Sequence, residues 1–231
     1  MLSGWPFALG YPSDHAQSAY YPGEKKLTKE EISLVSKVLE KHKIEPENTR
    51  LDSFTTSLLS YPIYVVRQAS ATKDPDYRFI NKEAPGIVWI SNGDHCDELE
   101  KVCESLLQAK GYTENETQAE VIDSYIRSFN TGEMKAFRDA QKAWVRDKAP
   151  VVETIMGFVE PYRDPHGVRC EWEGIVGISD PIESRKMRNF VDESSTFIRL
   201  LPWAVPGEND GKGPFQKDVF VAPDFTSIYS T

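Results

Sequence analysis

Histidine and cysteine are scarce in this sequence. Its 231 residues include four histidines and three cysteines. No two histidines are spaced to place two ring nitrogens on one helix face, and no Cys-x-x-Cys pair occurs. His95, Cys96 and Cys103 lie close in sequence, but the cysteines are better explained as buried helix positions than as metal ligands. The residues therefore predict neither a metal site nor a disulfide framework, and they favour a reducing, cytoplasmic location.

Positive charge and long apolar runs are also lacking. The chain has 36 acidic and 27 basic residues, a formal net charge of −9. Without a basic stripe to neutralise phosphates, we expect no nucleic acid and no anionic membrane as partner. No stretch approaches the roughly 20 apolar residues that span a bilayer, and the first residues do not form a signal peptide. The negative balance would suit a cationic ligand.

What is present indicates a globular protein. Hydrophobic residues make up 39% and aromatic residues 11% of the chain, enough for one large or two small domains. Thr28 to Glu31 form a capping box that begins a helix. Periodicity predicts helices over 28–44, 94–110, 114–129, 133–148 and 182–200, and strands over 58–68, 77–80 and 87–90. This order does not alternate as in a parallel fold, so we expect an α+β protein with an antiparallel sheet or small β-barrel and packed helices.

A β-hairpin is predicted over residues 154–178. Two apolar arms flank a turn with Pro and Gly at 163–167. Because side chains alternate along a strand, the hairpin gathers polar groups on one face: Glu160, Tyr162, Arg169, Glu171 and Glu173. Cys170 and Trp172 then point to the core. A polar outer face is ordinary for a half-buried hairpin, but crowded like charges are destabilising, which favours a site.

The hairpin pattern by itself leaves several functions open. Glu160, Glu171 and Glu173 could provide the acid and base pair of a glycosidase-like hydrolase. A non-catalytic interaction module could hold the basic N-termini of peptides on the same face. A half-domain that is unstable alone would instead expose a large apolar patch.

Residues 157–174, G-F-V-E-P-Y-R-D-P-H-G-V-R-C-E-W-E-G, carry a resemblance to a known family. They resemble the signature G-F-x-E-x-Y-R-D-P-x-G-x-R-G-E-x-E-G of the dipeptidyl peptidase III family of zinc exopeptidases. The similarity is strongest over 124–227 and includes W-V-R-D-K-A-P-V-V-E upstream and L-L-P-W and A-P-D-F-T-S downstream. Near the beginning, Ala19-Tyr20-Tyr21 and Asn48-Thr49-Arg50-Leu51 are similar too.

The resemblance implies an architecture and an activity. Family members have a lower lobe built around a β-barrel and a mostly helical upper lobe. Residues 1–180 would belong to the lower lobe, 181–218 would begin the upper lobe, and 219–231 would be a truncated return segment. The implied activity is the release of dipeptides from the free N-terminus of short peptides.

Roles for individual residues are implied only where the motif matches. The glutamate that matches Glu160 binds the substrate's terminal ammonium, and the phenol that matches Tyr162 stabilises the oxyanion. Glu173 matches a cleft residue, and Glu171 and Arg169 complete the expected substrate-binding set as orienting or structural positions. Three residues depart from the pattern: Pro161, His166 and Cys170.

The resemblance also implies what this sequence is missing. The family binds zinc through His-Glu-x-x-x-His and a later glutamate, and neither motif occurs here. The last residues, 224–231, match a segment that continues in the family. We therefore expect an N-terminal portion of the enzyme that lacks the zinc-binding motifs and is inactive alone. Zinc would be bound in the complete enzyme by the missing C-terminal part of the same polypeptide, and none by this chain.

Overall fold

The computed structural model describes residues 19–73, 78–81, 86–159, 161, 164, 167, 169–214 and 224–229. The chain divides into two compact units. The first consists of Met1–Val145 and Met156–Glu173, and the second of Arg146–Ile155 and Gly174–Thr231. The predicted lobe boundaries at residues 180 and 218 refer to a longer protein and remain predictions.

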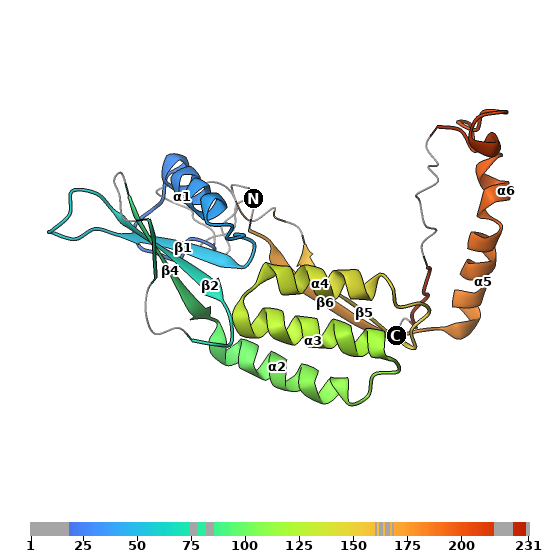
Figure 1. Cartoon of the computed structure of the whole chain (residues 1–231), viewed down its shortest axis with the longest axis horizontal. Helices are drawn as coiled ribbons and strands as arrows, with labels where there is room; N and C mark the ends of the chain where they lie inside the picture. The colour runs from blue at the N-terminus through green and yellow to red at the C-terminus, as the bar shows by residue number, and fades with distance from the viewer. Residues whose placement is uncertain are drawn as a thin grey trace. The chain divides into compact units, whose positions relative to one another are not determined.

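The first unit contains a four-stranded sheet (Figure 1). Its strands are β1 (Thr49–Phe54), β2 (Ile63–Ala69), β3 (Arg78–Asn81) and β4 (Ile87–Asp94). They lie in the order β1-β2-β4-β3. β1 and β2 are antiparallel, β2 and β4 are parallel, and β3 and β4 are antiparallel.

The predicted α+β class is confirmed, with a mixed sheet in place of a wholly antiparallel one. After β2 the chain passes to the far edge of the sheet, forms β3 there and returns as β4. Two reversals bring β4 beside β2 in the same direction, hence the parallel pair. Among the described residues the sheet is not closed into a barrel. Strand β1 was not predicted from the sequence. Its mostly polar residues T-R-L-D-S-F form a strand by pairing with β2.

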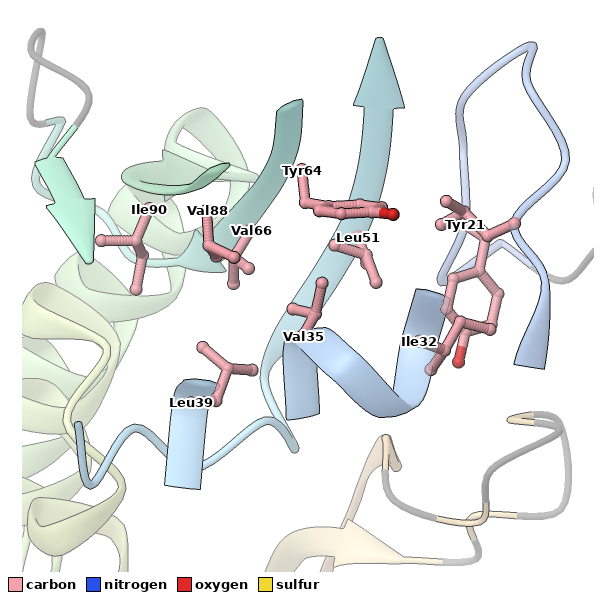
Figure 2. Close-up of a cluster of buried hydrophobic side chains, with 10 residues drawn as sticks. Tyr21, Ile32, Val35, Leu39, Leu51, Tyr64, Val66, Val88 and Ile90 are labelled. Atoms are coloured by element: carbon pink, nitrogen blue, oxygen red, sulfur yellow. The ribbon is translucent and has the colours of Figure 1, made fainter. Parts of the chain in front are cut away.

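Helix α1 (Lys29–Lys41) packs its apolar face on this sheet. The predicted capping box is confirmed, since Glu31 N–H donates to Thr28 Oγ1 at 3.2 Å and Thr28 N–H donates to Glu31 Oε2 at 2.8 Å. Figure 2 shows the core that results. Its buried side chains come from α1, the sheet and the segment before α1: Tyr21, Leu27, Ile32, Val35, Leu39, Leu51, Tyr64, Val66, Val88 and Ile90.

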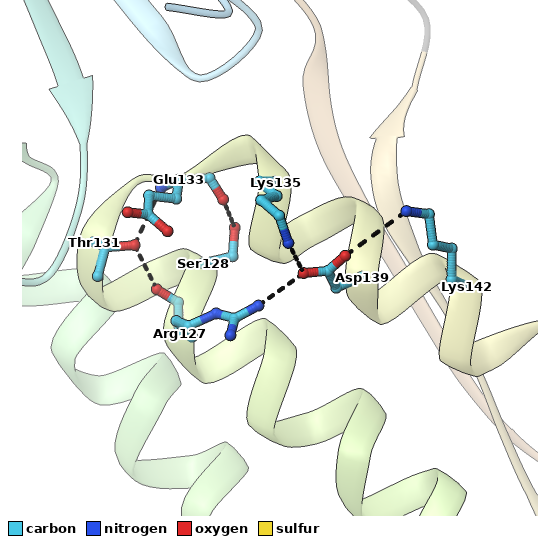
Figure 3. A network of polar contacts seen from close by, with 7 residues as sticks. All are labelled: Arg127, Ser128, Thr131, Glu133, Lys135, Asp139 and Lys142. Carbon is cyan, nitrogen blue, oxygen red and sulfur yellow. Dashed lines mark hydrogen bonds and ion pairs between the residues drawn. The ribbon is translucent and has the colours of Figure 1, made fainter.

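Three further helices follow, α2 (Cys96–Lys110), α3 (Glu116–Thr131) and α4 (Met134–Trp144), and lie side by side (Figure 1). α3 ends at Gly132, whose φ of 77° lies in the left-handed region that glycine favours. Ion pairs around Asp139 connect α3 and α4 on the surface (Figure 3). Exposed pairs of this kind contribute little, so the buried contacts between the helices hold them together.

The predicted hairpin is present as β5 (Val152–Val159) and β6 (Glu171–Ile178), which form a two-stranded sheet. Ser179 N–H donates to Val151 O at 2.9 Å, joining the end of β6 to the start of β5 as an antiparallel pair requires. Met156–Val159 and Glu171–Glu173 belong to the first unit, and the remaining strand residues to the second.

The second unit continues with α5 (Pro181–Asp192), α6 (Ser194–Ile198) and a 3₁₀ turn at Asn209–Gly211. Asp180 caps α5 by accepting from the N–H groups of residues 182 and 183. Several apolar side chains of these helices are exposed in this unit, including Met187, Phe190 and Phe197. None of the described helices is long and apolar enough to cross a lipid bilayer.

Candidate functional site

The turn of the hairpin is held by Asp164. This carboxylate is only 3% exposed and accepts hydrogen bonds from Tyr21 Oη at 2.5 Å and from Arg169 N–H at 2.7 Å. Its backbone N–H donates to Pro161 O at 3.1 Å, and its carbonyl accepts from Gly167 N–H at 2.8 Å. Gly167 has a φ of +65°, which glycine adopts without strain. These contacts support the predicted turn at 163–167.

Arg169 does not lie on the predicted polar face. Strand β6 begins two residues later, so strand alternation does not extend to this residue, and its side chain is 1% exposed. Its Nε donates to Thr49 O at 3.1 Å, and its Nη1 donates to Tyr21 Oη at 3.4 Å and lies 3.9 Å from Asp164 Oδ2. These contacts are structural. Its assignment to substrate binding stays a prediction.

Tyr21 completes this buried group. Burial is the main cause that raises the pKa of its phenol above the ordinary value, and the neighbouring Asp164 carboxylate raises it further. The hydroxyl therefore remains protonated and can donate to Asp164. We call Tyr21, Asp164 and Arg169 the turn-holding triad.

The first residues of β6 alternate as predicted. Trp172 packs into the aromatic cluster of the first unit, with ring centroids 4.8 Å from Phe129 and 5.0 Å from Phe158. Glu173 is exposed, whereas Glu171 is half-buried and lines a cavity. Glu160 and Tyr162 lie outside the described residues. The structure therefore gives geometry for only part of the predicted site.

The aromatic cluster packs against the hairpin through Trp172. Trp172 also contacts Tyr125 and Phe137 edge-on. Tyr125 Oη donates to Met156 O at 2.9 Å and accepts from Gln141 Nε2 at 2.7 Å, which ties α3 and α4 to β5. Burial raises the pKa of Tyr125 to about 12. The start of β6 therefore rests on a packed, hydrogen-bonded base.

Cys170, which replaces a glycine of the family pattern, is half-buried beside this cluster. Its N–H donates to Glu47 O at 3.5 Å, and its side chain lines the same cavity as Glu171. Burial raises the pKa of the thiol, so the thiolate is disfavoured at neutral pH. The side chain fits its surroundings as a small apolar group.

The described residues do not fit a zinc site. Within this part of the chain, no three His, Cys, Asp or Glu side chains are grouped so that they could hold a metal ion. His95 is 54% exposed, while the Cys103 thiol is buried against α3, near Ile126 O at 3.9 Å. Cys103 is buried as predicted, whereas Cys96 is only partly buried, so the prediction that both cysteines are buried is wrong for Cys96. No step of a reaction through zinc can be built from these side chains.

The contacts of Tyr21 and Thr49 with Arg169 of the hairpin turn were not predicted from the sequence. More than a hundred residues separate them from Arg169, so periodicity and turn rules carry no signal for the contact. One signal existed. Both residues lie in the short segments near the beginning that share the family resemblance, 19–21 and 48–51.

Comparison with known proteins decides the family. The model of peptidase family M49 matches residues 3–230. The chain belongs to peptidase family M49. It is 36% identical to dipeptidyl peptidase 3 of Nematostella vectensis, a match that covers 95% of this chain. It is also 36% identical to dipeptidyl peptidase 3 of Dictyostelium discoideum, again over 95% of this chain. The predicted resemblance is confirmed.

This M49 chain spans about 30% of the length of those relatives: 30% of the Nematostella protein and 29% of the Dictyostelium protein. Among solved structures it is similar to dipeptidyl-peptidase III from Corallococcus sp. strain EGB. That match has a TM-score of 0.47 and 20% identity, and it covers 79% of this chain and 29% of the other.

Proposed function

We propose that this chain is a portion of a zinc-dependent dipeptidyl peptidase that releases dipeptides from the free N-terminus of short peptides. The observation that carries the proposal is the M49 match over residues 3–230, together with relatives named dipeptidyl peptidase 3. A glycosidase-like use of the carboxylates has no support from these relatives.

Two residues of the hairpin would act on the substrate. Glu160 would bind the terminal ammonium, because a fixed carboxylate forms a charge-assisted bond with an amine. Tyr162 would donate to the oxyanion that develops at the scissile carbonyl, a role that needs a preorganised donor. The turn-holding triad supports this proposal, since it fixes Asp164 and Arg169, which closely follow these two positions in the sequence.

The other predicted residues would contribute less directly. The exposed carboxylate of Glu173 is available to a peptide. Glu171, two residues earlier in the sequence, is half-buried. Arg169 would act by holding the turn through Asp164 and Tyr21. Binding of substrate by all three remains part of the proposal.

Zinc would be held by residues outside the described ones. When bound, it would supply Lewis-acid chemistry at the scissile carbonyl. The proposed partner is therefore the missing C-terminal part of the same polypeptide. A cytoplasmic location agrees with the three cysteines, all of which are free thiols.

A chimeric enzyme tests the proposal. This chain would replace the matching segment of the Nematostella relative, and hydrolysis of a dipeptidyl arylamide would be measured with bound zinc quantified. We expect the chimera to release dipeptides.

Two variants of the chimera test the residue roles. Tyr162→Phe should lower kcat by about 10²–10³-fold with little change in KM, the usual effect of losing one oxyanion donor. Glu160→Gln should instead raise KM, because the ammonium loses its charged partner.

The control is Tyr112→Phe, which alters a phenol that is 90% exposed on the surface. A folded, zinc-loaded chimera with no dipeptide release would contradict the proposal. Retained peptide affinity in that chimera would favour a non-catalytic peptide-binding module. Unchanged kcat in Tyr162→Phe would remove the oxyanion role and leave the family membership intact.

A further inference from the structure

A cavity of about 490 Å³ lies within the first unit. Binding sites for small molecules commonly have volumes of 300–1,000 Å³. The cavity is bordered by β1, β2, β4, α2, α3, the end of β5 and the start of β6. Its lining residues are Ala19, Tyr20, Glu47, Asn48, Thr49, Arg50, Ala69, Asp94, His95, Leu99, Val102, Ser128, Phe129, Phe158, Cys170, Glu171 and Trp172. Its size alone would admit a small organic ligand.

Most of the wall is apolar. Leu99 and Val102 from α2 line the same cavity as Phe129, Phe158 and Trp172. Three aromatic rings packed edge to face give a rigid surface, and such surfaces favour flat aromatic or branched aliphatic groups. The wall therefore selects for a ligand with an apolar body.

The charged side chains that line the cavity carry a net negative charge. Its charged members are three carboxylates, Glu47, Asp94 and Glu171, against one guanidinium, Arg50. Arg50 is already paired with Asp94, through Nε to Oδ2 at 2.7 Å and Nη2 to Oδ1 at 2.5 Å. Because those two charges compensate each other, the remaining charge of the wall is negative and complements a cation.

Two acceptors of this wall lack hydrogen bonds. Glu47 Oε2 and Asn48 Oδ1 are buried, and neither has a partner among the described residues. The orientation of the Asn48 amide is set, because its Nδ2 donates to Gly132 O at 2.8 Å and leaves the carbonyl oxygen as the open end. A buried acceptor without a donor costs stability, which a ligand that supplies donors would recover.

An alkylammonium is the group that satisfies both observations. It has three N–H donors and a positive charge, so one group has enough donors for both acceptors and can neutralise one carboxylate. A hydroxyl has one donor and no charge, and an acid would meet like charge. We propose that this cavity binds a small primary amine with an aromatic or branched aliphatic body, whose ammonium is held by Glu47 and Asn48.

The pKa of Glu47 supports this site. Burial is the largest cause that raises it above the ordinary value, and Glu45 raises it further. Arg138 and Arg169 lower the pKa only in part. A bound ammonium would stabilise the carboxylate, so amine affinity should fall as the solution is acidified and Glu47 becomes protonated.

The test compares two probes of the same shape on the full chain. 2-Phenylethylamine and 2-phenylethanol differ in one polar group, and their binding would be measured by calorimetry at pH 7. We expect the amine to bind at least about tenfold more tightly. Glu47→Gln should weaken amine binding by roughly 10- to 100-fold, the range for a hydrogen bond to a charged group, and leave the alcohol unchanged. This test measures no turnover, so it does not depend on the proposed peptidase function.

Two further variants keep the result interpretable. Glu40→Gln removes an exposed carboxylate from α1, away from the residues of the cavity, and should leave both affinities unchanged. Val102→Trp alters a residue that is 37% exposed and lines the cavity, and should reduce binding of both probes by occupying the space. Circular dichroism would confirm that each variant is folded.

Several outcomes would overturn the proposal. The first is that the unaltered chain does not bind the amine at millimolar concentration. Equal affinity for amine and alcohol is another, because the cavity would then be an apolar space only. Amine binding that survives both Glu47→Gln and Val102→Trp would place the ligand elsewhere. A loss of stability in Glu47→Gln without any amine binding would assign Glu47 to pairing with Arg169.

Discussion

The phenol of Tyr21 donates a 2.5 Å hydrogen bond to the carboxylate of Asp164, which lies 143 residues further along the chain. The contact joins the segment before α1 to the turn between β5 and β6. Arg169 is part of the same buried group, with its guanidinium carbon 5.4 Å from the centroid of the Tyr21 ring. A turn that carries predicted substrate contacts is therefore held by a residue from the other end of the first unit.

Replacing Tyr21 by Phe should destabilise the protein. The substitution keeps the ring and removes the donor to a buried carboxylate, which typically costs about 1–3 kcal/mol of unfolding free energy. Urea denaturation of the purified chain would measure it. Tyr112→Phe, on an exposed side chain, should change nothing. Equal stability of Tyr21→Phe and the unaltered chain would show that the hydrogen bond does not hold the turn.

Trp172→Ala should be more damaging than the loss of an exposed tryptophan. Trp172 is partly buried and contacts four aromatic rings, so the cost of about 3–5 kcal/mol for a fully buried aromatic is the upper limit of the expected loss. Denaturation followed by circular dichroism is the measurement. Trp203→Ala, at a position 46% exposed, is the matched control and should cost much less. If the two variants lose similar stability, the aromatic cluster does not support β6 as described.

Glu47 should make the stability of the chain depend on pH. Its pKa is raised in the folded state, so the folded protein holds this proton more tightly than the unfolded chain. The resulting stabilisation is complete below the unfolded pKa, near 4.5, and is lost as the pH rises through the folded value. As the pH rises from acid to neutral, the Glu47→Gln variant should therefore become more stable relative to the unaltered chain.

The measurement for Glu47 is a set of urea denaturation curves from pH 4 to pH 8. Glu40→Gln is the control, and its stability should follow that of the unaltered chain at each pH. A difference between Glu47→Gln and the unaltered chain that stays constant with pH would mean that burial does not shift this carboxyl.

Loss of the capping box of α1 should lower the free energy of unfolding by less than the loss of Trp172. Thr28→Ala removes the acceptor for Glu31 N–H and should cost about 0.5–2 kcal/mol. The exposed Thr55, in the loop after β1, gives the control Thr55→Ala. Thermal unfolding of both variants distinguishes them. A stable Thr28→Ala would indicate that packing of α1 on the sheet outweighs its cap.

Helix ends and the hairpin turn could be predicted from the sequence. The capping box at Thr28, the end of α2 at Gly111 and the hairpin around Gly167 depend on contacts between residues a few positions apart. Trp172 was placed in the core from strand alternation alone, a correct prediction because side-chain direction in a strand has a period of two. The family, too, was determined by the sequence, through a motif of eighteen positions.

Tertiary structure decided what depends on distant pairing. β1 forms because β2 offers it hydrogen-bonding partners, and β4 lies parallel to β2 because β3 occupies the far edge. Arg169 is buried because Tyr21, Thr49 and Asp164 surround it, which overrides the alternation expected at that position. The unpartnered acceptors of Glu47 and Asn48 likewise exist only where separate elements enclose a cavity. Local patterns fix which way a residue faces along its own element, but the groups that meet across elements are set by packing of the whole unit.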